Sequence, residues 1–171
     1  TGKYQGKYRI PTARWPGWDY GSNAAYFITI CIDDLTHGFG EVIDGNMNLT
    51  PLGQAAMDCW LSIPDHFPFV VLDEFIVMPN HVHGILIIDK PIDDTAPLET
   101  RNKFGPQSKN LGSIVRGYKI GVTKYARQHN IPFKWQARYY DHVIRNDDEY
   151  ERIQHYIIDN AERWKEDRYY T

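Results

Sequence analysis

The stretch from Phe75 to Ile88 constrains the fold more than any other part of the sequence. Two apolar, Ile- and Val-rich runs flank a Pro79-Asn80 break, a pattern that predicts two strands joined by a turn. The second run begins with His81 and His83, and side chains alternate between the faces of a strand, so both imidazoles project from the same face. Such a pair can decorate a strand end, but at an open strand start it also forms half of a metal site.

The segments around this pair alternate between strands and helices. Hydrophobic periodicity predicts strands over 25–32, 70–78, 82–88 and 137–145, a short hairpin over 39–49, and helices over 51–63, from 111 to about 127 and from 146 onward. This order indicates an α+β protein with a ferredoxin-like βαββαβ sandwich, in which an antiparallel sheet carries helices on one face. The histidines would lie on a central strand, with the extra C-terminal helix packed close to them.

The whole chain, residues 1–171, is predicted to form a single domain. A hydrophobic content of 42% is ample for one packed core. Residues 1–22 form an irregular arm in this prediction, and the polar stretch 89–110 forms a mobile loop. Cys31 and Cys59 lack the spacing of a disulfide framework or a zinc knuckle, and are expected to be inert core thiols. No apolar run approaches the roughly 20 residues of a membrane span and no signal peptide is evident, so we expect a cytoplasmic protein without membrane contact.

The last predicted helix supplies a second candidate group. Tyr156 and Asn160 are four residues apart, and therefore neighbours one helical turn apart. A tyrosine beside a metal can act as a phenolate nucleophile, and an amide oxygen can be a third ligand. The alternative is a surface aromatic without a catalytic role. The competing tyrosines are Tyr118, Tyr125, Tyr139, Tyr140 and Tyr150, of which Tyr118, Tyr125 and Tyr150 lie on apolar stripes and are better explained as core.

Several cationic residues are interleaved with aromatic residues, a mixture that suits contacts to phosphates and stacking of unpaired bases. The candidates for DNA binding are Arg9, Arg14, Arg116, Lys119 and Arg138. Most surface helices carry such charges, so the cations on the helix after 111 can also be an ordinary solvated face. The net charge of −3 argues against a protein that coats nucleic acid indiscriminately.

Three sequence blocks, in the order in which they occur along the chain, resemble the REP-associated tyrosine transposases. These proteins are single-tyrosine members of the HUH (His-hydrophobe-His) superfamily. The blocks are MPNHVHGI at 78–85, WQARYYDHVIRN at 135–146 and YIIDN at 156–160, and the resemblance extends from about residue 8 to 164. It implies that His81 and His83 are metal ligands, that Val82 is the hydrophobe, that Tyr156 is the nucleophile and that Asn160 occupies the place of a polar ligand. Many relatives carry Asn-Pro at this point, whereas Ala161 follows Asn160 here, so the helix can run on to Asp167.

The resemblance also implies the reaction. The expected activity is metal-dependent cleavage and transfer of single-stranded DNA at hairpins, through a 5′-phosphotyrosine intermediate and with Mg²⁺ or Mn²⁺ as the cofactor. A monomer or a homodimer is expected, associated with the bacterial nucleoid when bound to DNA. Two alternatives remain: a domesticated protein that binds hairpin DNA or RNA without cleaving it, and a zinc hydrolase that uses His81, His83 and a further histidine such as His142.

Overall fold

The structure is a computed structural model that describes residues 3–4, 7–8, 24–89 and 105–171. The predicted arm over 1–22 and most of the predicted loop over 89–110 lie outside these residues, apart from two short strands, β1 (Lys3–Tyr4) and β2 (Lys7–Tyr8). The prediction that this loop extends to residue 110 is wrong, because helix α4 already begins at Gly105.

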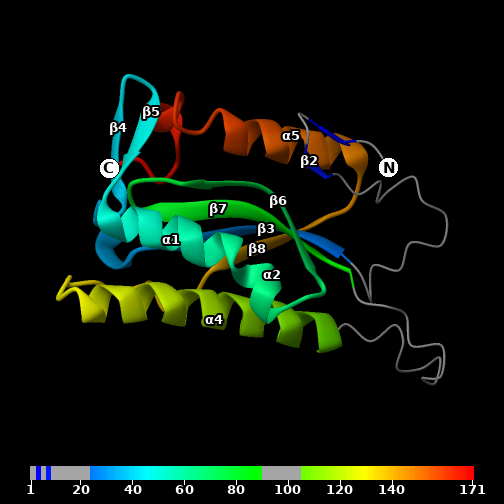
Figure 1. Cartoon of the computed structure of the whole chain (residues 1–171). Coiled ribbons are helices and arrows are strands. Elements are labelled where there is room, and N and C mark those ends of the chain that lie inside the picture. Colours follow the sequence, from blue (N-terminus) through cyan, green and yellow to red (C-terminus); the bar gives the residue numbers. More distant parts are fainter. Residues whose placement is uncertain (1–2, 5–6, 9–23, 90–104) are drawn as a thin grey trace.

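A four-stranded antiparallel sheet forms the centre of the described structure (Figure 1). Its strands are β3 (Ala24–Cys31), β6 (Val70–Val77), β7 (His81–Ile88) and β8 (Tyr140–Ile144), in the spatial order β6-β7-β3-β8. Every residue of β7 is buried, because β7 is paired on both sides and covered on both faces. The strand with the two histidines is therefore central, as predicted.

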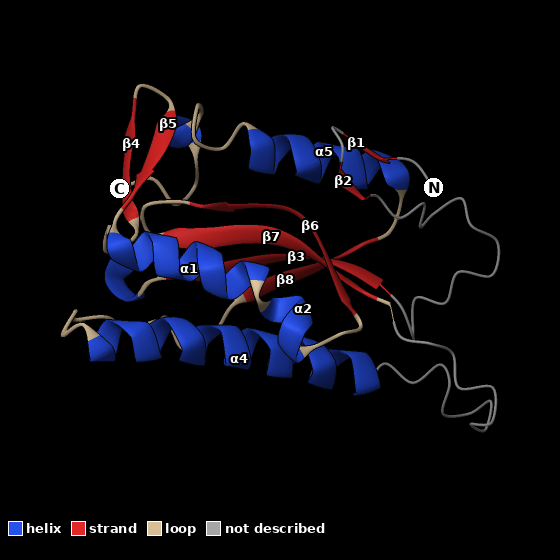
Figure 2. Ribbon diagram, in the orientation of Figure 1, coloured by secondary structure: helices blue, strands red, loops and turns tan. Residues whose placement is uncertain are grey.

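Helices cover both faces of this sheet (Figure 2). Helices α1 (Pro51–Leu61), α2 (Ile63–His66) and α4 (Gly105–Gln128) lie on one face, and α5 (Asp147–Ile158) lies on the other. Val82 and Leu86 of β7 join the core beneath α1 and α4, whereas Ile85 and Ile87 join the core beneath α5. The ferredoxin-like α+β fold with an extra C-terminal helix is thus confirmed, and the extra helix, α5, packs on the opposite face of the sheet from α1, α2 and α4.

Two of the three predicted helix starts, those of α1 and α5, are present within one residue, and each has a capping side chain. The hydroxyl of Thr50 accepts a hydrogen bond from the Gly53 amide at 3.1 Å, and Pro51 occupies the first helical position of α1. The Asn146 side chain accepts from the Glu149 amide at 2.8 Å and caps α5. The predicted hairpin is also found, with β4 (Gly40–Ile43) and β5 (Asn46–Leu49), and a short 3-10 helix, η1 (Asp33–Leu35), precedes it.

The predicted continuation of the last helix to Asp167 is wrong. Helix α5 ends at Ile158, the chain turns, and a second 3-10 helix, η2 (Trp164–Glu166), follows. Ala161 and Trp164 are buried against Met78, in a small core separate from the one beneath α5. Ala161 and Trp164 therefore pack on Met78 after the helix has ended, and Asn160 lies in the turn instead of on the helix.

Strand β8 begins three residues later than predicted, at Tyr140. The ammonium group of Lys119 on α4 donates to the carbonyl oxygens of Gln136 at 2.9 Å and Arg138 at 3.3 Å. These two carbonyls are therefore hydrogen-bonded to α4, whereas regular pairing of β8 with β3 begins at Tyr140. In the part of the chain that is described, no helix has the length and apolar character needed to cross a membrane.

Gly84 provides a test of the packing between β7 and α1. A Cβ atom at this position would lie 2.1 Å from Cζ2 of Trp60, an indole that is 1% exposed. Gly84→Ala should therefore lower the free energy of unfolding by about 1–3 kcal/mol, the usual cost of overpacking, as measured by urea denaturation. Gly112→Ala on α4 is the control, since its Cβ would lie an ordinary 4.0 Å from the Tyr139 hydroxyl. Equal stability of the Gly84→Ala protein and the parent would contradict this packing.

Candidate active site

His81 and His83 turn toward one another on the face of β7 that α5 covers. Their Nε2 atoms are 2.8 Å apart, and their ring centroids are 4.2 Å apart. The sequence predicted an open strand start, but the two side chains are only 0% and 1% exposed. The C-terminal segment covers them, with the Tyr169 ring centroid 4.7 Å from that of His81.

Two polar neighbours orient the imidazoles from behind. Nδ1 of His81 is 2.6 Å from Oδ1 of Asn80, and Nδ1 of His83 is 2.8 Å from the Thr29 hydroxyl. Because an amide oxygen can only accept, Asn80 places a proton on Nδ1 of His81 and leaves its Nε2 lone pair directed into the site. This is the arrangement that commonly supports a metal-ligating histidine.

Burial keeps both imidazoles neutral. It lowers the pKa of His83, and it lowers the pKa of His81 well below the usual range, with the neighbouring His83 acting in the same direction. A neutral imidazole is the form that binds a metal, so protonation does not block the pair at neutral pH.

Asp167 is the residue that sequence reasoning missed. Its carboxylate approaches His83 Nε2 at 3.9 Å and completes, with His81 and His83, a group whose ligand atoms all lie within 4.8 Å of one another. Oδ1 of Asp167 accepts from the Tyr169 amide at 2.7 Å, and Oδ2 accepts from the Asn160 side chain. Burial alone would raise the pKa of this carboxyl, but the interactions with His83 and Asn160 outweigh it and hold the pKa well below its usual range.

Tyr156 reaches the same point from α5. Its hydroxyl donates to Oδ2 of Asp167 at 2.9 Å and lies 3.3 Å from His83 Nε2, and its side chain is 40% exposed. Burial, followed by the negative charge of Asp167, raises the pKa of this phenol. A phenolate therefore needs a positive charge nearby before it forms at neutral pH.

The donor atoms present fit a divalent cation. Two neutral imidazoles and one carboxylate converge, and Oδ1 of Asn160 is buried without a hydrogen-bond partner among the described residues. A buried polar atom without a partner is costly, and a cation is one way to satisfy it. His81, His83 and Asp167 would hold the metal directly, while the predicted role of Asn160 as a ligand stays a prediction.

The competing site residues have other partners. The Tyr118 hydroxyl donates to the Ala56 carbonyl at 3.0 Å, and burial raises the pKa of this phenol well above its usual range. Tyr150 is buried and hydrogen-bonded to Asp73. His142 pairs with Glu149, and in the described part of the chain it is not in the group formed by His81, His83 and Asp167.

Burial also raises the pKa of the Cys31 and Cys59 thiols, that of Cys31 to about 11, in keeping with inert core cysteines.

The predicted DNA-binding residues are not brought to this cluster. Arg116 and Lys119 belong to α4 on the other face of the sheet, and Lys119 is engaged with backbone carbonyls. Arg138 is exposed in the segment before β8. Arg9 and Arg14 lie outside the described residues.

Comparison with known proteins shows which family the chain belongs to. No protein-family model matches the chain. An uncharacterized protein of Haemophilus influenzae is 40% identical over 178 aligned positions, which cover 100% of this chain and 99% of that protein. A second Haemophilus influenzae protein, a putative REP-associated tyrosine transposase, is 23% identical over 142 positions, 83% of this chain and 72% of the relative.

A solved structure shares the fold. It is that of a REP-associated tyrosine transposase bound to a REP hairpin, with a TM-score of 0.55, 19% identity and coverage of 84% of this chain and 68% of that chain. The resemblance read from the three sequence blocks is thereby confirmed. The chain belongs to one family with the Haemophilus influenzae protein that is 40% identical to it, and it is a relative of the REP-associated tyrosine transposases.

Proposed function

We propose that this protein cleaves and rejoins single-stranded DNA by transesterification, with Tyr156 as the nucleophile and His81, His83 and Asp167 as the metal-binding group. The Tyr156 oxygen forms a bond to a backbone phosphorus while the bond from that phosphorus to the 3′ oxygen breaks. The phenol gives up its proton and the departing oxygen takes one up, so the products are a 5′-phosphotyrosine and a free 3′-hydroxyl. The new ester conserves the bond energy for rejoining.

One observation carries the proposal: the Tyr156 hydroxyl lies within 3.3 Å of both His83 and Asp167, although His83 is 73 residues away from Tyr156 in the sequence. Asp167 orients the hydroxyl by accepting its hydrogen bond, and Asn80 and Thr29 hold the imidazoles in place. His81, His83 and Asp167 would hold a divalent cation, Mn²⁺ or Mg²⁺, which would supply positive charge that favours the phenolate and offsets charge on the phosphoryl oxygens.

Hairpin DNA is the proposed substrate. The proposal is supported by the relative named as a putative REP-associated tyrosine transposase and by the structural neighbour that is bound to a REP hairpin. A protein that binds hairpins without cleaving them is the second candidate, because the two histidines are almost fully buried beneath the C-terminal segment. Formation of a covalent adduct separates the two.

The first test concerns the metal. Excess chelator should abolish the protein–DNA adduct on a denaturing gel, and added Mn²⁺ should restore it. His83→Ala should lose both Mn²⁺ binding, measured by calorimetry, and the adduct, because it removes one of the two converging nitrogens. His142→Ala is the matched control and should keep both, since His142 pairs with Glu149 instead. Unchanged adduct formation in chelator would remove the basis for the metal.

The second test concerns the nucleophile. Tyr156→Phe should keep the fold, the Mn²⁺ affinity and the hairpin affinity, yet form no adduct, because only the attacking hydroxyl is removed. Tyr118→Phe loses one buried hydrogen bond, worth about 1 kcal/mol of stability, and should still form the adduct. Peptide mapping that places the DNA on another tyrosine, or cleavage by Tyr156→Phe at the normal rate, would contradict the assignment.

The third test concerns the form of the substrate. Binding measured by fluorescence anisotropy in chelator should favour a hairpin with unpaired flanks over a blunt duplex of the same composition. Affinity should fall as salt rises, because contacts to phosphates release counterions. Equal affinity for both forms at one salt concentration would count against a protein that handles unpaired DNA.

A further inference from the structure

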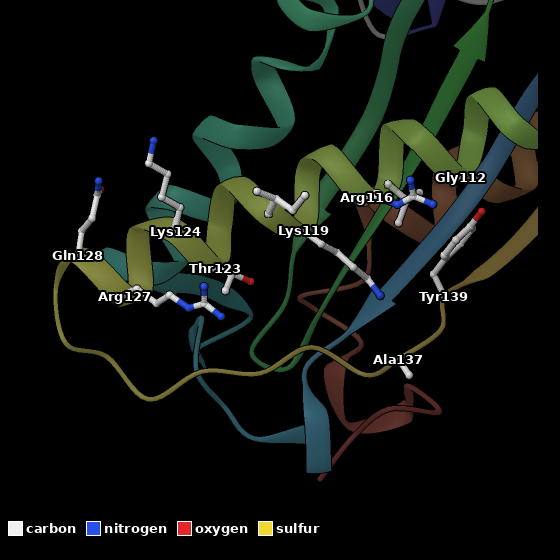
Figure 3. A pocket seen from close by; sticks show the side chains of 11 residues that line it. Gly112, Arg116, Lys119, Thr123, Lys124, Arg127, Gln128, Ala137 and Tyr139 are labelled. Carbon is white, nitrogen blue, oxygen red and sulfur yellow. The ribbon is translucent and has the colours of Figure 1, made fainter.

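A cationic groove runs along α4 (Figure 3). It lies on the face of the sheet opposite α5, the helix that carries Tyr156 (Figure 1). It has a volume of about 700 Å³ and is called the α4 groove below. Four cationic residues line it and no carboxylate does, although the chain as a whole has a net charge of −3. The lining residues are Gly112, Val115, Arg116, Lys119, Ile120, Thr123, Lys124, Arg127, Gln128, Ala137 and Tyr139.

Three of the four cations are available to a ligand. Lys119 donates to the carbonyls of Gln136 and Arg138 and so fixes the far wall of the groove. Arg116, Lys124 and Arg127 are exposed, and within the described residues none of them forms a salt bridge. From Arg116 to Arg127 the helix rises about 16 Å, so these charges follow a line and suit an extended polyanion better than a single small anion.

Apolar groups lie between these cations. Ile120 is 60% exposed in the groove, and Tyr139 lies across from α4 with its hydroxyl near Gly112. A charged groove with apolar and aromatic surfaces is typical of sites that bind single-stranded nucleic acid, in which phosphates contact the cations and base or sugar faces contact the apolar groups. The length of about 16 Å corresponds to about five stacked nucleotides at about 3.4 Å each.

An aromatic path leads from this groove toward the nucleophile. Tyr139 lines the groove, and the next residue, Tyr140, begins the edge strand β8 and is 48% exposed. The centroid of the Phe27 ring is 6.3 Å from the centroid of the Tyr140 ring and 6.1 Å from that of the Tyr156 ring. The exposed ring at the sheet edge therefore stands between the groove on one face and the active-site cluster on the other.

We propose that the α4 groove binds the unpaired DNA that flanks the hairpin, and that this strand passes around the β8 edge over Tyr140 to reach Tyr156. The location of the cut at Tyr156 rests on the proposed function. Binding in the groove does not, because it needs no metal and no chemistry.

The groove is tested with a fluorescein-labelled DNA hairpin that carries an unpaired oligothymidine flank of roughly ten nucleotides, about twice the proposed site, on its 5′ or its 3′ side. The variant Arg116→Gln/Lys124→Gln/Arg127→Gln should bind the better of these hairpins about tenfold more weakly in chelator. The slope of log K against log salt should become shallower by about 2, since each single-strand phosphate contact contributes about 0.7. Affinity for the bare hairpin should change less than about twofold.

Lys134→Gln is the matched control, because Lys134 is 81% exposed and lies outside the groove. It should bind as the parent does. Ile120→Ser should weaken binding of the flanked hairpin without changing the salt slope, since it removes apolar surface and no charge. Equal losses on bare and flanked hairpins would assign the groove to the paired stem and overturn the proposal, as would an unchanged affinity of the triple variant.

The path around β8 is tested at Tyr140. Tyr140→Ala should lose about tenfold in affinity for the flanked hairpin, within the range for one stacked base, whereas Tyr140→Phe should keep the affinity because the ring remains. Equal affinities of these two variants and the parent would overturn the path. In Mn²⁺, the triple variant should need more DNA for half-maximal adduct formation but reach the parental rate at saturation.

The two proposals fail separately. If the parent protein forms no adduct while the binding differences hold, the proposed chemistry is wrong and the groove stands. If the parent forms the adduct through Tyr156 while the triple variant binds and reacts as the parent does, the chemistry stands and the groove proposal is wrong.

Discussion

The burial of β7 on both faces is the constraint on which the rest of the structure depends. A strand that is buried on both faces has a nearly continuous apolar sequence. Any polar side chain on such a strand needs hydrogen-bond partners inside the protein. Nδ1 of His81 is hydrogen-bonded to Asn80, and Nδ1 of His83 is hydrogen-bonded to Thr29. The two Nε2 atoms therefore face one another, 2.8 Å apart. Two neutral imidazoles that already carry a proton on Nδ1 would offer two lone pairs and no proton between them, so a cation is the natural partner for that arrangement.

The position of Tyr156 depends on a second buried polar group. Asp73 lies where the register between β6 and β7 shifts, and its carboxylate accepts hydrogen bonds from Tyr150 and from Gln154, the latter at 3.1 Å. Both donors belong to α5, so a strand at the edge of the sheet fixes the rotation of the helix that carries the nucleophile. The rotation of α5 about its axis matters because Tyr156, two residues after Gln154, must contact His83 and Asp167.

Local rules recovered most of the fold. Strand alternation placed the two histidines on one face, and hydrophobic periodicity placed the starts of α1 and α5 within one residue of their true positions. These features depend on neighbours a few residues away, which the sequence contains directly.

Asp167 could not be found in the same way. The apolar spacing continues through Ala161 to Trp164 as if the helix did, and both side chains are indeed buried, but against Met78 instead of the core beneath α5. The sequence shows that a residue is apolar without showing which core receives it. On a helix reaching Asp167, that carboxylate would lie about 16 Å beyond Tyr156, whereas the turn after α5 returns it to hydrogen-bonding distance.

The charges around Tyr156 explain why binding and chemistry would be separated. The recess beside it contains Arg152 and Arg163, but also Asp159, Glu166 and Asp167, so it offers a phosphate little net attraction. Asp167 in particular repels an approaching phosphate until a cation offsets its charge. At physiological salt, screening limits the reach of the electrostatic field of a surface charge to about 8 Å. The carboxylates near Tyr156 therefore do not weaken the attraction of DNA to the cations of the α4 groove. A groove on the opposite face can therefore supply the affinity for DNA that the immediate surroundings of the nucleophile lack.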